Sequence, residues 1–233
     1  MNKLIVVTGG TKGIGRAILV KFAAQGFDLI TCARKKDDLD KLKIHFEKLG
    51  VKVYAEVADM ADRNQVKNFT EFVNALKRPV DVLVNNAGIF VPGLVTEEPD
   101  GVLESLINSN VYSAYHTTRG IISQMKANKR GHIFNMCSIA SIKAYPNGGS
   151  YAISKFALLG FSKVLREELM EHGIRVTAIM PGATYTSSWG SSDLPEDRFM
   201  KADDVADSVY AAYALSGRSV VEEMVIRPQL GDI

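Results

Sequence analysis

The amino-acid sequence predicts a single-domain α/β protein built on a doubly wound parallel sheet of about seven strands, with helices on both faces. Short apolar runs rich in β-branched residues alternate with longer helical patterns along the chain, and strands that alternate with helices require right-handed crossovers between parallel strands. A glycine-rich turn follows the first apolar run. The 233 residues, 46% of them hydrophobic, are enough for one core. Because no linker, repeat or low-complexity segment interrupts the chain, we expect one domain over residues 1–233.

The elements can be assigned from the hydrophobic pattern. We expect strands at residues 4–7, 27–33, 51–57, 80–84, 132–137, 174–180 and 219–226. We expect helices at residues 14–25, 36–49, 62–76, 101–126, 150–171 and 202–216. Continuous apolar runs are typical of strands that are buried on both faces of a parallel sheet. Ligands bind at the carboxyl ends of such strands, so the residues that follow each strand are the candidates for a functional site.

The first predicted strand leads into a glycine-rich turn at residues 8–15, Thr-Gly-Gly-Thr-Lys-Gly-Ile-Gly. Glycines in these places allow a tight turn, close approach of the backbone to a phosphate, and close packing of the next helix on the strand. The free N–H groups and the positive dipole end of that helix face the same phosphate. We therefore predict a dinucleotide site that includes Gly9, Thr11, Lys12, Gly13, Ile14 and Gly15.

The end of the second predicted strand selects between the two nicotinamide cofactors. Ala33 occupies the place where an acidic residue would bind the ribose hydroxyls of NAD. Arg34 follows it, and together with Lys12 it favours a ribose 2′-phosphate. We interpret Lys35 and Lys36 as solvated loop residues. The sequence thus predicts NADP (NADPH) as the cofactor.

Polar and small residues also follow the third and fourth predicted strands. Asp59 either accepts a hydrogen bond from the adenine amino group or caps the next helix, a role for which Asp62 is better placed. After the fourth strand, Asn86, Ala87 and Gly88 permit near contact between the backbone and a ligand. We include Asp59 and these three residues in the predicted cofactor site.

The predicted helix at residues 101–126 contains an unfavourable segment in its middle. Asn108, Ser109 and Asn110 are poor residues for a helix interior, because their side chains compete for backbone hydrogen bonds. We expect a compensating feature there, either a kink or a bound water near the active site.

Tyr151 and Lys155 lie one turn apart in the predicted helix 150–171, and hence on one face of it. A free phenol has a pKa near 10, and an ammonium group about 4 Å away lowers it by about 3 units at most. Such a tyrosine can act as a general acid or base. The same spacing arises by chance in roughly half of such chains, so the pair alone decides nothing. Ser138 ends the preceding strand, and the loop between them lets both hydroxyls face one substrate.

Charge and composition exclude several other functions. Lys and Arg exceed Asp and Glu by 28 − 26 = 2, which indicates neither a nucleic-acid nor a membrane partner. Cys32 and Cys137 fall in apolar runs, where a free cysteine packs as a small hydrophobe. The four histidines show no zinc-site spacing, so we expect no metal. No apolar run is long enough for a signal peptide or a membrane span, so we expect a cytoplasmic protein.

Six of these features, taken in chain order, resemble the motifs of the short-chain dehydrogenase/reductase family over essentially the whole chain. The features are the turn at 8–15, the Asn-Asn-Ala-Gly segment at 85–88, Asn110, Ser138, the Tyr151/Lys155 pair and Pro181-Gly182. The resemblance implies a Rossmann-like fold and the transfer of a nicotinamide hydride to a carbonyl carbon. It also implies dimers or tetramers formed through the helices at 101–126 and 150–171.

The resemblance assigns roles to four residues as a catalytic tetrad. Tyr151 would protonate the carbonyl oxygen, and Ser138 would hydrogen-bond that oxygen as its charge develops. Lys155 would hold the nicotinamide ribose and lower the pKa of Tyr151. Asn110 would support a water that leads protons to Lys155. The segment that would cradle the carboxamide contains Pro181, Gly182, Thr184 and Thr186.

The resemblance leaves the substrate open. The family's acyl-carrier-protein reductases usually end in a segment resembling Val-Asp-Gly-Gly, whereas residues 222–229 read Glu-Glu-Met-Val-Ile-Arg-Pro-Gln. This ending is closer to the sepiapterin reductase and 3-hydroxy acid dehydrogenase branches. We expect reduction of a carbonyl, with sepiapterin-like compounds as candidates. The alternatives are an NADP-dependent 3-hydroxy acid dehydrogenase or 3-oxoacyl reductase and, more remotely, a nucleotide-sensing protein without turnover.

Candidate substrate-contacting residues fall in the segment after the sixth strand. Tyr185 and Trp189, with Phe199, could line a pocket for a flat or apolar substrate. The acidic residues of the same segment either anchor the amino groups of a pterin or are simply solvated. Those residues are Asp193, Glu196 and Asp197.

Overall fold

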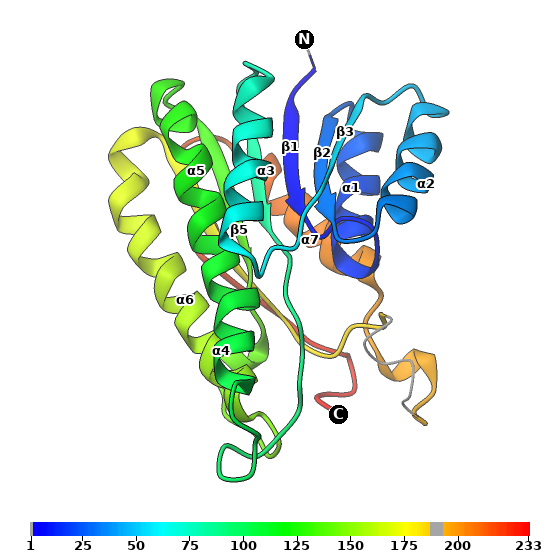
Figure 1. Ribbon diagram of the computed structural model, residues 1–233, viewed down its shortest axis with the longest axis vertical. Coiled ribbons are helices and arrows are strands. Elements are labelled where there is room, and N and C mark those ends of the chain that lie inside the picture. Colours follow the sequence, from blue (N-terminus) through cyan, green and yellow to red (C-terminus); the bar gives the residue numbers. More distant parts are fainter. Residues whose placement is uncertain (1, 187–192) are drawn as a thin grey trace.

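The chain forms a parallel sheet with helices on both faces, as a computed structural model that describes residues 2–186 and 193–233 shows (Figure 1). The strands are β1 (Leu4–Thr8), β2 (Asp28–Ala33), β3 (Val53–Val57), β4 (Val82–Asn85), β5 (Gly131–Met136), β6 (Ile174–Pro181) and β7 (Glu223–Ile226). The described strands lie in the order β3-β2-β1-β4-β5-β6-β7, and every neighbouring pair is parallel. This order confirms the predicted doubly wound sheet. It reverses between β1 and β4, which creates a switch point at their carboxyl ends.

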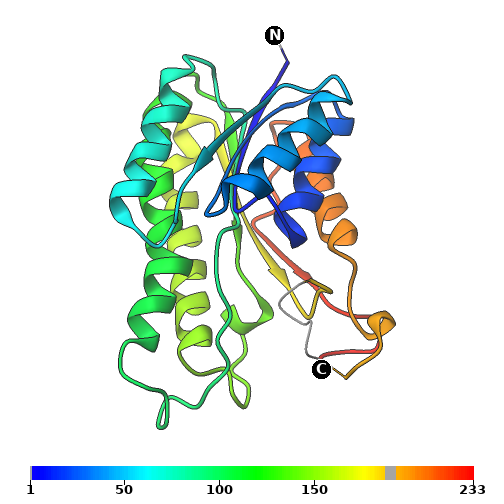
Figure 2. The same cartoon turned by 45° about the vertical axis from the view of Figure 1, so that its right-hand side comes forward.

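The helices form two layers. The main helices are α1 (Gly13–Ala24), α2 (Lys36–Glu47), α3 (Arg63–Ala75), α4 (Val102–Ile107), α5 (Ser113–Ala127), α6 (Gly149–Leu169) and α7 (Ala202–Ala214). Figures 1 and 2 show α1, α2 and α7 on one face of the sheet, and α3, α4, α5 and α6 on the other. Within the described residues, no helix is both long and apolar enough to cross a membrane.

Alternating side chains of β1 serve both layers. Ile5 and Val7 pack in the cluster that contains Phe22 of α1, whereas Leu4 and Val6 pack in the cluster that contains Phe69 of α3. Every residue of β1 is buried. Because β1 is central and covered on both sides, its carboxyl end is fixed against both helical layers, which makes it a rigid support for a ligand site.

The structure corrects three of the predicted elements. The helix expected at residues 101–126 is interrupted by a π-helical turn, η1 (Asn108–Tyr112), between α4 and α5. The last strand starts at Glu223 rather than at residue 219. The helix expected at 150–171 ends at Leu169, and a 3₁₀ turn (Met170–His172) leads to Gly173 at φ +68°, a conformation that glycine adopts without strain. The first correction meets the expectation of a compensating feature at Asn108 to Asn110.

Candidate active site

The glycine-rich turn is fastened to the end of β4. Gly9 and Gly13 have φ of +71° and +52°, which glycine adopts without strain. A Cβ at Gly15 would meet Asn86 Nδ2 and the Gly9 carbonyl at 2.5 Å. Asn86 Nδ2 donates to the carbonyls of Thr8 at 2.9 Å and Gly9 at 3.2 Å. The Thr8 hydroxyl accepts hydrogen bonds from the backbone N–H groups of Asn86 and Ala87, both at 3.0 Å. The predicted residues from the two sides of the switch point therefore form one unit.

The start of α1 fits a pyrophosphate. Its N-cap residue, Lys12, provides no side-chain cap, and the first helical bond runs from Arg16 N to the Lys12 carbonyl at 3.2 Å. The N–H groups of the first helical turn have no partner inside a helix. An anion is favoured in this place by both the N–H groups and the helix dipole. Thr11 and Ile14, both partly exposed, border the same turn.

The predicted cofactor-binding residues Lys12, Arg34 and Asp59 differ in the contacts that their side chains make. Lys12 Nζ lies 3.4 Å from Asp38 Oδ2 in an exposed ion pair. Arg34 is exposed and forms no ion pair or hydrogen bond recorded among residues 2–186 and 193–233. Asp59 accepts a hydrogen bond from Ala61 N at 3.0 Å with Oδ1. Asp62 caps α3 by accepting hydrogen bonds from the N–H groups at positions 64 and 65. This confirms the expectation that Asp62 is better placed than Asp59 for that role. Asp59 is therefore not the helix cap.

Ser138 and Tyr151 are brought together at the carboxyl edge of β5. Ser138 follows β5 and caps a short 3₁₀ turn (Ile139–Ser141), where its hydroxyl accepts from Ala140 N at 3.1 Å. Burial raises the pKa of Tyr151, and hydrogen bonding toward the Ser138 side chain opposes that rise. Tyr151 is therefore a protonated phenol at neutral pH, with a serine hydroxyl beside it.

Lys155 lies on the same face of α6 but contacts a different group from the one expected. Its Nζ donates to the Met136 carbonyl at 2.8 Å and lies 5.7 Å from the centre of the Tyr151 ring. Burial lowers the pKa of Lys155 to about 8. The pKa of Tyr151 is raised overall because burial of the phenol is the largest influence on it, while the Lys155 ammonium faces the Met136 carbonyl. The lowering of that pKa by Lys155 stays a prediction.

Asn110 is buried in the π-helical turn and joins three segments. Its Oδ1 accepts from Ile89 N at 2.8 Å, and its Nδ2 donates to the Ile89 carbonyl at 3.0 Å and to Ser154 Oγ at 2.9 Å. Ser154 Oγ in turn donates to the Tyr151 carbonyl at 2.7 Å. A Cβ at Gly88 would meet Asn110 Oδ1 at 2.8 Å and Lys155 Nζ at 3.9 Å. The four predicted catalytic residues thus belong to one connected site.

Three residues near Tyr151 were missed by reasoning from the sequence. Ser154 had a signal, because it lies three residues after Tyr151 on the same helix face. Phe90 packs edge-on against the Tyr151 ring, with 4.8 Å between the ring centres, but it lies in an irregular loop without a pattern. Burial, and to a lesser extent the charge of Tyr151, raise the pKa of Tyr145 to about 12.

The segment after β6 borders the glycine-rich turn. Gly182 N donates to the Ile226 carbonyl at 2.8 Å, and the buried Thr184 donates through Oγ1 to the Gly182 carbonyl at 3.1 Å. A Cβ at Gly13 would lie 3.1 Å from Thr186 Cγ2. This places the predicted carboxamide cradle, from Pro181 onward, against the phosphate-binding turn.

The predicted substrate contacts are only partly described. The exposed Tyr185 packs against Phe199, with 5.7 Å between the ring centres. Trp189 lies outside the described residues. Asp193, Glu196 and Asp197 are exposed, which agrees with their interpretation as solvated residues.

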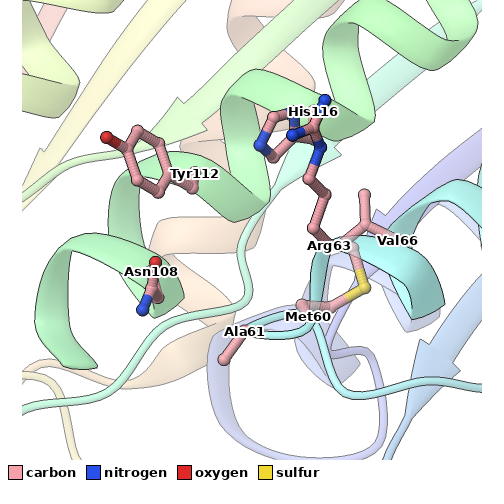
Figure 3. Close-up of a pocket in the computed structure, with 7 residues that line it drawn as sticks. All are labelled: Met60, Ala61, Arg63, Val66, Asn108, Tyr112 and His116. Atoms are coloured by element: carbon pink, nitrogen blue, oxygen red, sulfur yellow. The ribbon is translucent and has the colours of Figure 1, made fainter. Parts of the chain in front are cut away.

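A separate cavity of about 440 Å³ lies between the start of α3 and the η1–α5 region (Figure 3). It is lined by Met60, Ala61, Arg63, Val66, Asn108, Tyr112 and His116. None of these residues is among the predicted catalytic or cofactor-binding residues, so this cavity is distinct from the Tyr151 site. Among the described residues, no group of three or more His, Cys, Asp or Glu could hold a metal ion.

Comparison with known proteins identifies the family. A family model described as short chain dehydrogenase matches residues 3–197. The chain is 32% identical over 241 residues to the sepiapterin reductase of Chlorobaculum tepidum, covering 100% of this chain and 99% of that protein. It is also 32% identical over 218 residues to a 3-oxoacyl-[acyl-carrier-protein] reductase of Thermotoga maritima, covering 89% of each.

Solved structures give the same result. An alcohol dehydrogenase from Thermococcus sibiricus, complexed with 5-hydroxy-NADP, matches with a TM-score of 0.93 and 27% identity over 100% of this chain and 99% of that one. The L-sorbose reductase of Gluconobacter frateurii, complexed with NADPH and L-sorbose, matches with a TM-score of 0.89 and 28% identity over 97% and 95% of the two chains. The chain therefore belongs to the short-chain dehydrogenase family, whose members are NAD(P)-binding oxidoreductases acting on carbonyl and CH–OH groups.

Proposed function

We propose that this protein is an NADPH-dependent reductase that converts a carbonyl to an alcohol, with Tyr151 as the general acid. The observation that carries the proposal is that Lys155 Nζ donates to the Met136 carbonyl at the end of β5, which brings the Tyr151/Lys155 pair to the sheet edge where Ser138 lies. A phenol whose pKa is raised by burial is protonated at neutral pH. A protonated acid is the form that reduction of a carbonyl requires.

The chain's own residues would act in sequence on the carbonyl oxygen. NADPH supplies a hydride to the carbonyl carbon when it is bound. Ser138 donates a hydrogen bond to the oxygen as negative charge develops, and Tyr151 transfers its proton to that oxygen. The buried Lys155, with a pKa of about 8, is largely charged at neutral pH and stabilises the phenolate that remains. Asn110 and Ser154 hold the backbone around Tyr151 through their hydrogen bonds.

The proposed preference for NADP rests on the cations Arg34 and Lys12 and on Ala33, which stands where an acidic residue would bind the ribose of NAD. Arg34 is exposed at the end of β2, next to Ala33, and Lys12 lies in the turn at the start of α1. A guanidinium binds a phosphate with two parallel hydrogen bonds. Relatives with solved structures support this choice, since several were determined with NADP or NADPH. Asp59 is proposed to accept from the adenine amino group.

The substrate is proposed to be a sepiapterin-like compound, with a ketone on the side chain of a flat ring. The likeness to a sepiapterin reductase over the full length supports this proposal. Aromatic residues around Tyr151, namely Phe90 and Tyr145, would suit a flat ring. A second candidate is a 3-oxoacyl thioester, because a 3-oxoacyl-[acyl-carrier-protein] reductase is equally identical over a shorter alignment. The remote alternative, a nucleotide-sensing protein without turnover, is disfavoured because such a protein has no need of the Ser138, Tyr151 and Lys155 side chains.

The proposal is tested by a panel of NADPH oxidation assays. The panel contains sepiapterin, 2,3-butanedione, a 3-oxo ester and acetoacetyl-coenzyme A, each also measured with NADH. We expect turnover with NADPH on at least one carbonyl compound of the panel and a loss of it in Tyr151→Phe. Absence of turnover on every member would refute the reductase, and equal efficiency with NADH would refute the cofactor preference.

The proposed assembly is a homodimer or homotetramer built through α5 and α6. Ile153, Phe156 and Val164 of α6 are exposed apolar residues, and a Cβ at Gly160 would meet no atom within 4 Å. An apolar helix face with an open glycine suits close packing against a second helix. Sedimentation velocity would give a monomer if this is wrong.

A further inference from the structure

The catalytic helix α6 is capped by a residue that lies far from it in the sequence. Its own N-cap residue, Gly148, has no side chain to satisfy the first N–H groups. Glu98, in the loop between β4 and α4, does so instead. Its Oε1 accepts from Ser150 N at 2.9 Å, and its Oε2 accepts a short hydrogen bond from Ser150 Oγ. Ser150 is buried and directly precedes Tyr151.

Two glycines make room for this carboxylate. A Cβ at Gly93 would lie 2.9 Å from Glu98 Cγ, and a Cβ at Gly149 would lie within clashing distance of Glu98 Oε1. Gly93 N also donates to the Asn147 carbonyl at 3.0 Å, which holds the two loops together. The backbone on both sides of Glu98 is therefore shaped around it.

The position also suits a negative charge. Among the described residues, Glu98 is in no ion pair with a lysine, arginine or histidine. Its partner is the N-terminus of α6, a helix of 21 residues whose dipole favours an anion there. The contact is thus a helix cap supplied from 52 residues away.

The same loop touches Tyr151 directly. Ile89 is held by Asn110 through two hydrogen bonds, Phe90 packs edge-on against Tyr151, and Glu98 is held by Ser150. The loop is therefore fixed at Ile89 and at Glu98, and Phe90, next to the first of these points, packs on the Tyr151 ring. Loss of the Glu98 contact would release the first turn of α6, which carries Tyr151.

We propose that Glu98 is a positioning residue for the reaction: it fixes Tyr151 by fastening the β4–α4 loop to the first turn of α6. The inference rests on the proposed role of Tyr151 as the general acid. Its effect on rate arises because a reacting group displaced by about 1 Å can cost about 100-fold in turnover.

The test compares Glu98→Ala, Glu98→Gln and a control, Asn74→Ala. Asn74 also joins two elements by two hydrogen bonds, to Gly120 O at 2.9 Å and from Gln124 Nε2 at 2.8 Å, but it lies between α3 and α5. With sepiapterin and 2,3-butanedione as probes, Glu98→Ala should lower kcat between about 10-fold and about 100-fold, while the KM for NADPH changes by less than about twofold. The amide oxygen of Glu98→Gln can still accept from Ser150 N, and its NH2 group can donate to Ser150 Oγ in the reverse direction, so this variant should restore most of kcat.

Gly93→Ala provides a variant that keeps the carboxylate but displaces it. Gly93→Ala alone should lower kcat. When it is added to Glu98→Ala, kcat should not fall any further, as expected for two residues that act through the same contact. Independent losses that multiply would overturn the proposal. So would a kcat of Glu98→Ala within about twofold of that of Asn74→Ala.

Amide hydrogen exchange tests the inference independently of turnover. In Glu98→Ala, exchange at residues 150–153 should speed up while the rest of α6 is unchanged, and Asn74→Ala should show no change there. If wild-type protein reduces none of the probes, the proposed function fails, and the exchange data still decide whether Glu98 fixes this turn. Equal exchange in the wild type and Glu98→Ala overturns the proposal.

Discussion

Replacement of Lys155 by methionine should stabilise the fold while it removes activity. Lys155 is 7% exposed, and burial lowers its pKa from 10.5 to about 8. Between these two values the unfolded chain binds more protons than the folded protein, so the stability of the wild type rises as pH rises through this window. A shift of about 2.5 pKa units corresponds to a cost of about 3 kcal/mol at pH 7, and the cost falls to about 1 kcal/mol at pH 10.

Methionine keeps the length of the lysine stem without its charge. The variant loses the hydrogen bond from the charged Lys155 to the Met136 carbonyl, which costs about 2 kcal/mol at pH 7. The diagnostic quantity is therefore the change with pH. The stability of Lys155→Met relative to the wild type should decrease by about 2 kcal/mol between pH 7 and pH 10.

Urea unfolding of the cofactor-free protein at pH 7, 8, 9 and 10 measures this difference. Other titrating groups are common to the two proteins, so they cancel in the comparison. Stability curves that run parallel between pH 7 and pH 10 would refute the reasoning. A parallel result would mean that Lys155 is as well solvated in the folded protein as in the unfolded chain.

Three further perturbations test other parts of the molecule. Tyr151→Phe should lower kcat by about 100-fold or more yet leave NADPH binding, followed by fluorescence, unchanged; full turnover would contradict its role as the acid. Arg34→Asp should weaken the binding of NADPH between roughly 10-fold and 100-fold without weakening the binding of NADH. An equal loss of affinity for both cofactors would rule out a 2′-phosphate contact. His132 is buried with its pKa lowered from 6.5 to about 2, chiefly by burial and further by Arg175. The folded protein then binds fewer protons than the unfolded chain below pH 6.5, so the wild type should lose about 2 kcal/mol between pH 7 and pH 5, and His132→Gln should not.

The sheet could be predicted because each strand has its own local signal. Val6 and Val7 belong to a continuous apolar run, and the turn at Gly9 to Gly15 follows it at once, so the pattern and the motif agree. The handedness of the crossovers restricts the possible topologies, but the order β3-β2-β1-β4-β5-β6-β7 was not among the predictions. The parts that failed were boundaries, such as the start of β7 at Glu223, where edge pairing rather than hydropathy sets the limit.

The candidate site was predictable as a set of residues but not as a set of contacts. Asn110, Ser138 and Lys155 could be selected by chain order and residue type. The sequence could not indicate that Lys155 Nζ donates to the Met136 carbonyl, or that burial raises the pKa of Tyr151. Both depend on the dielectric environment and on backbone groups from other elements, which no spacing encodes.

The sequence by itself determined the fold class, and it supplied the glycine-rich turn and the candidate reacting groups, because periodicity and residue chemistry are local. Only the tertiary structure decided what surrounds Tyr151. Glu98 and Phe90 reach it from a loop more than fifty residues away in the chain, and neither lies in a repeating pattern. The physical reason is that a cap or a ring contact needs only one atom in the right place, and the packing of the sheet and helices sets that place.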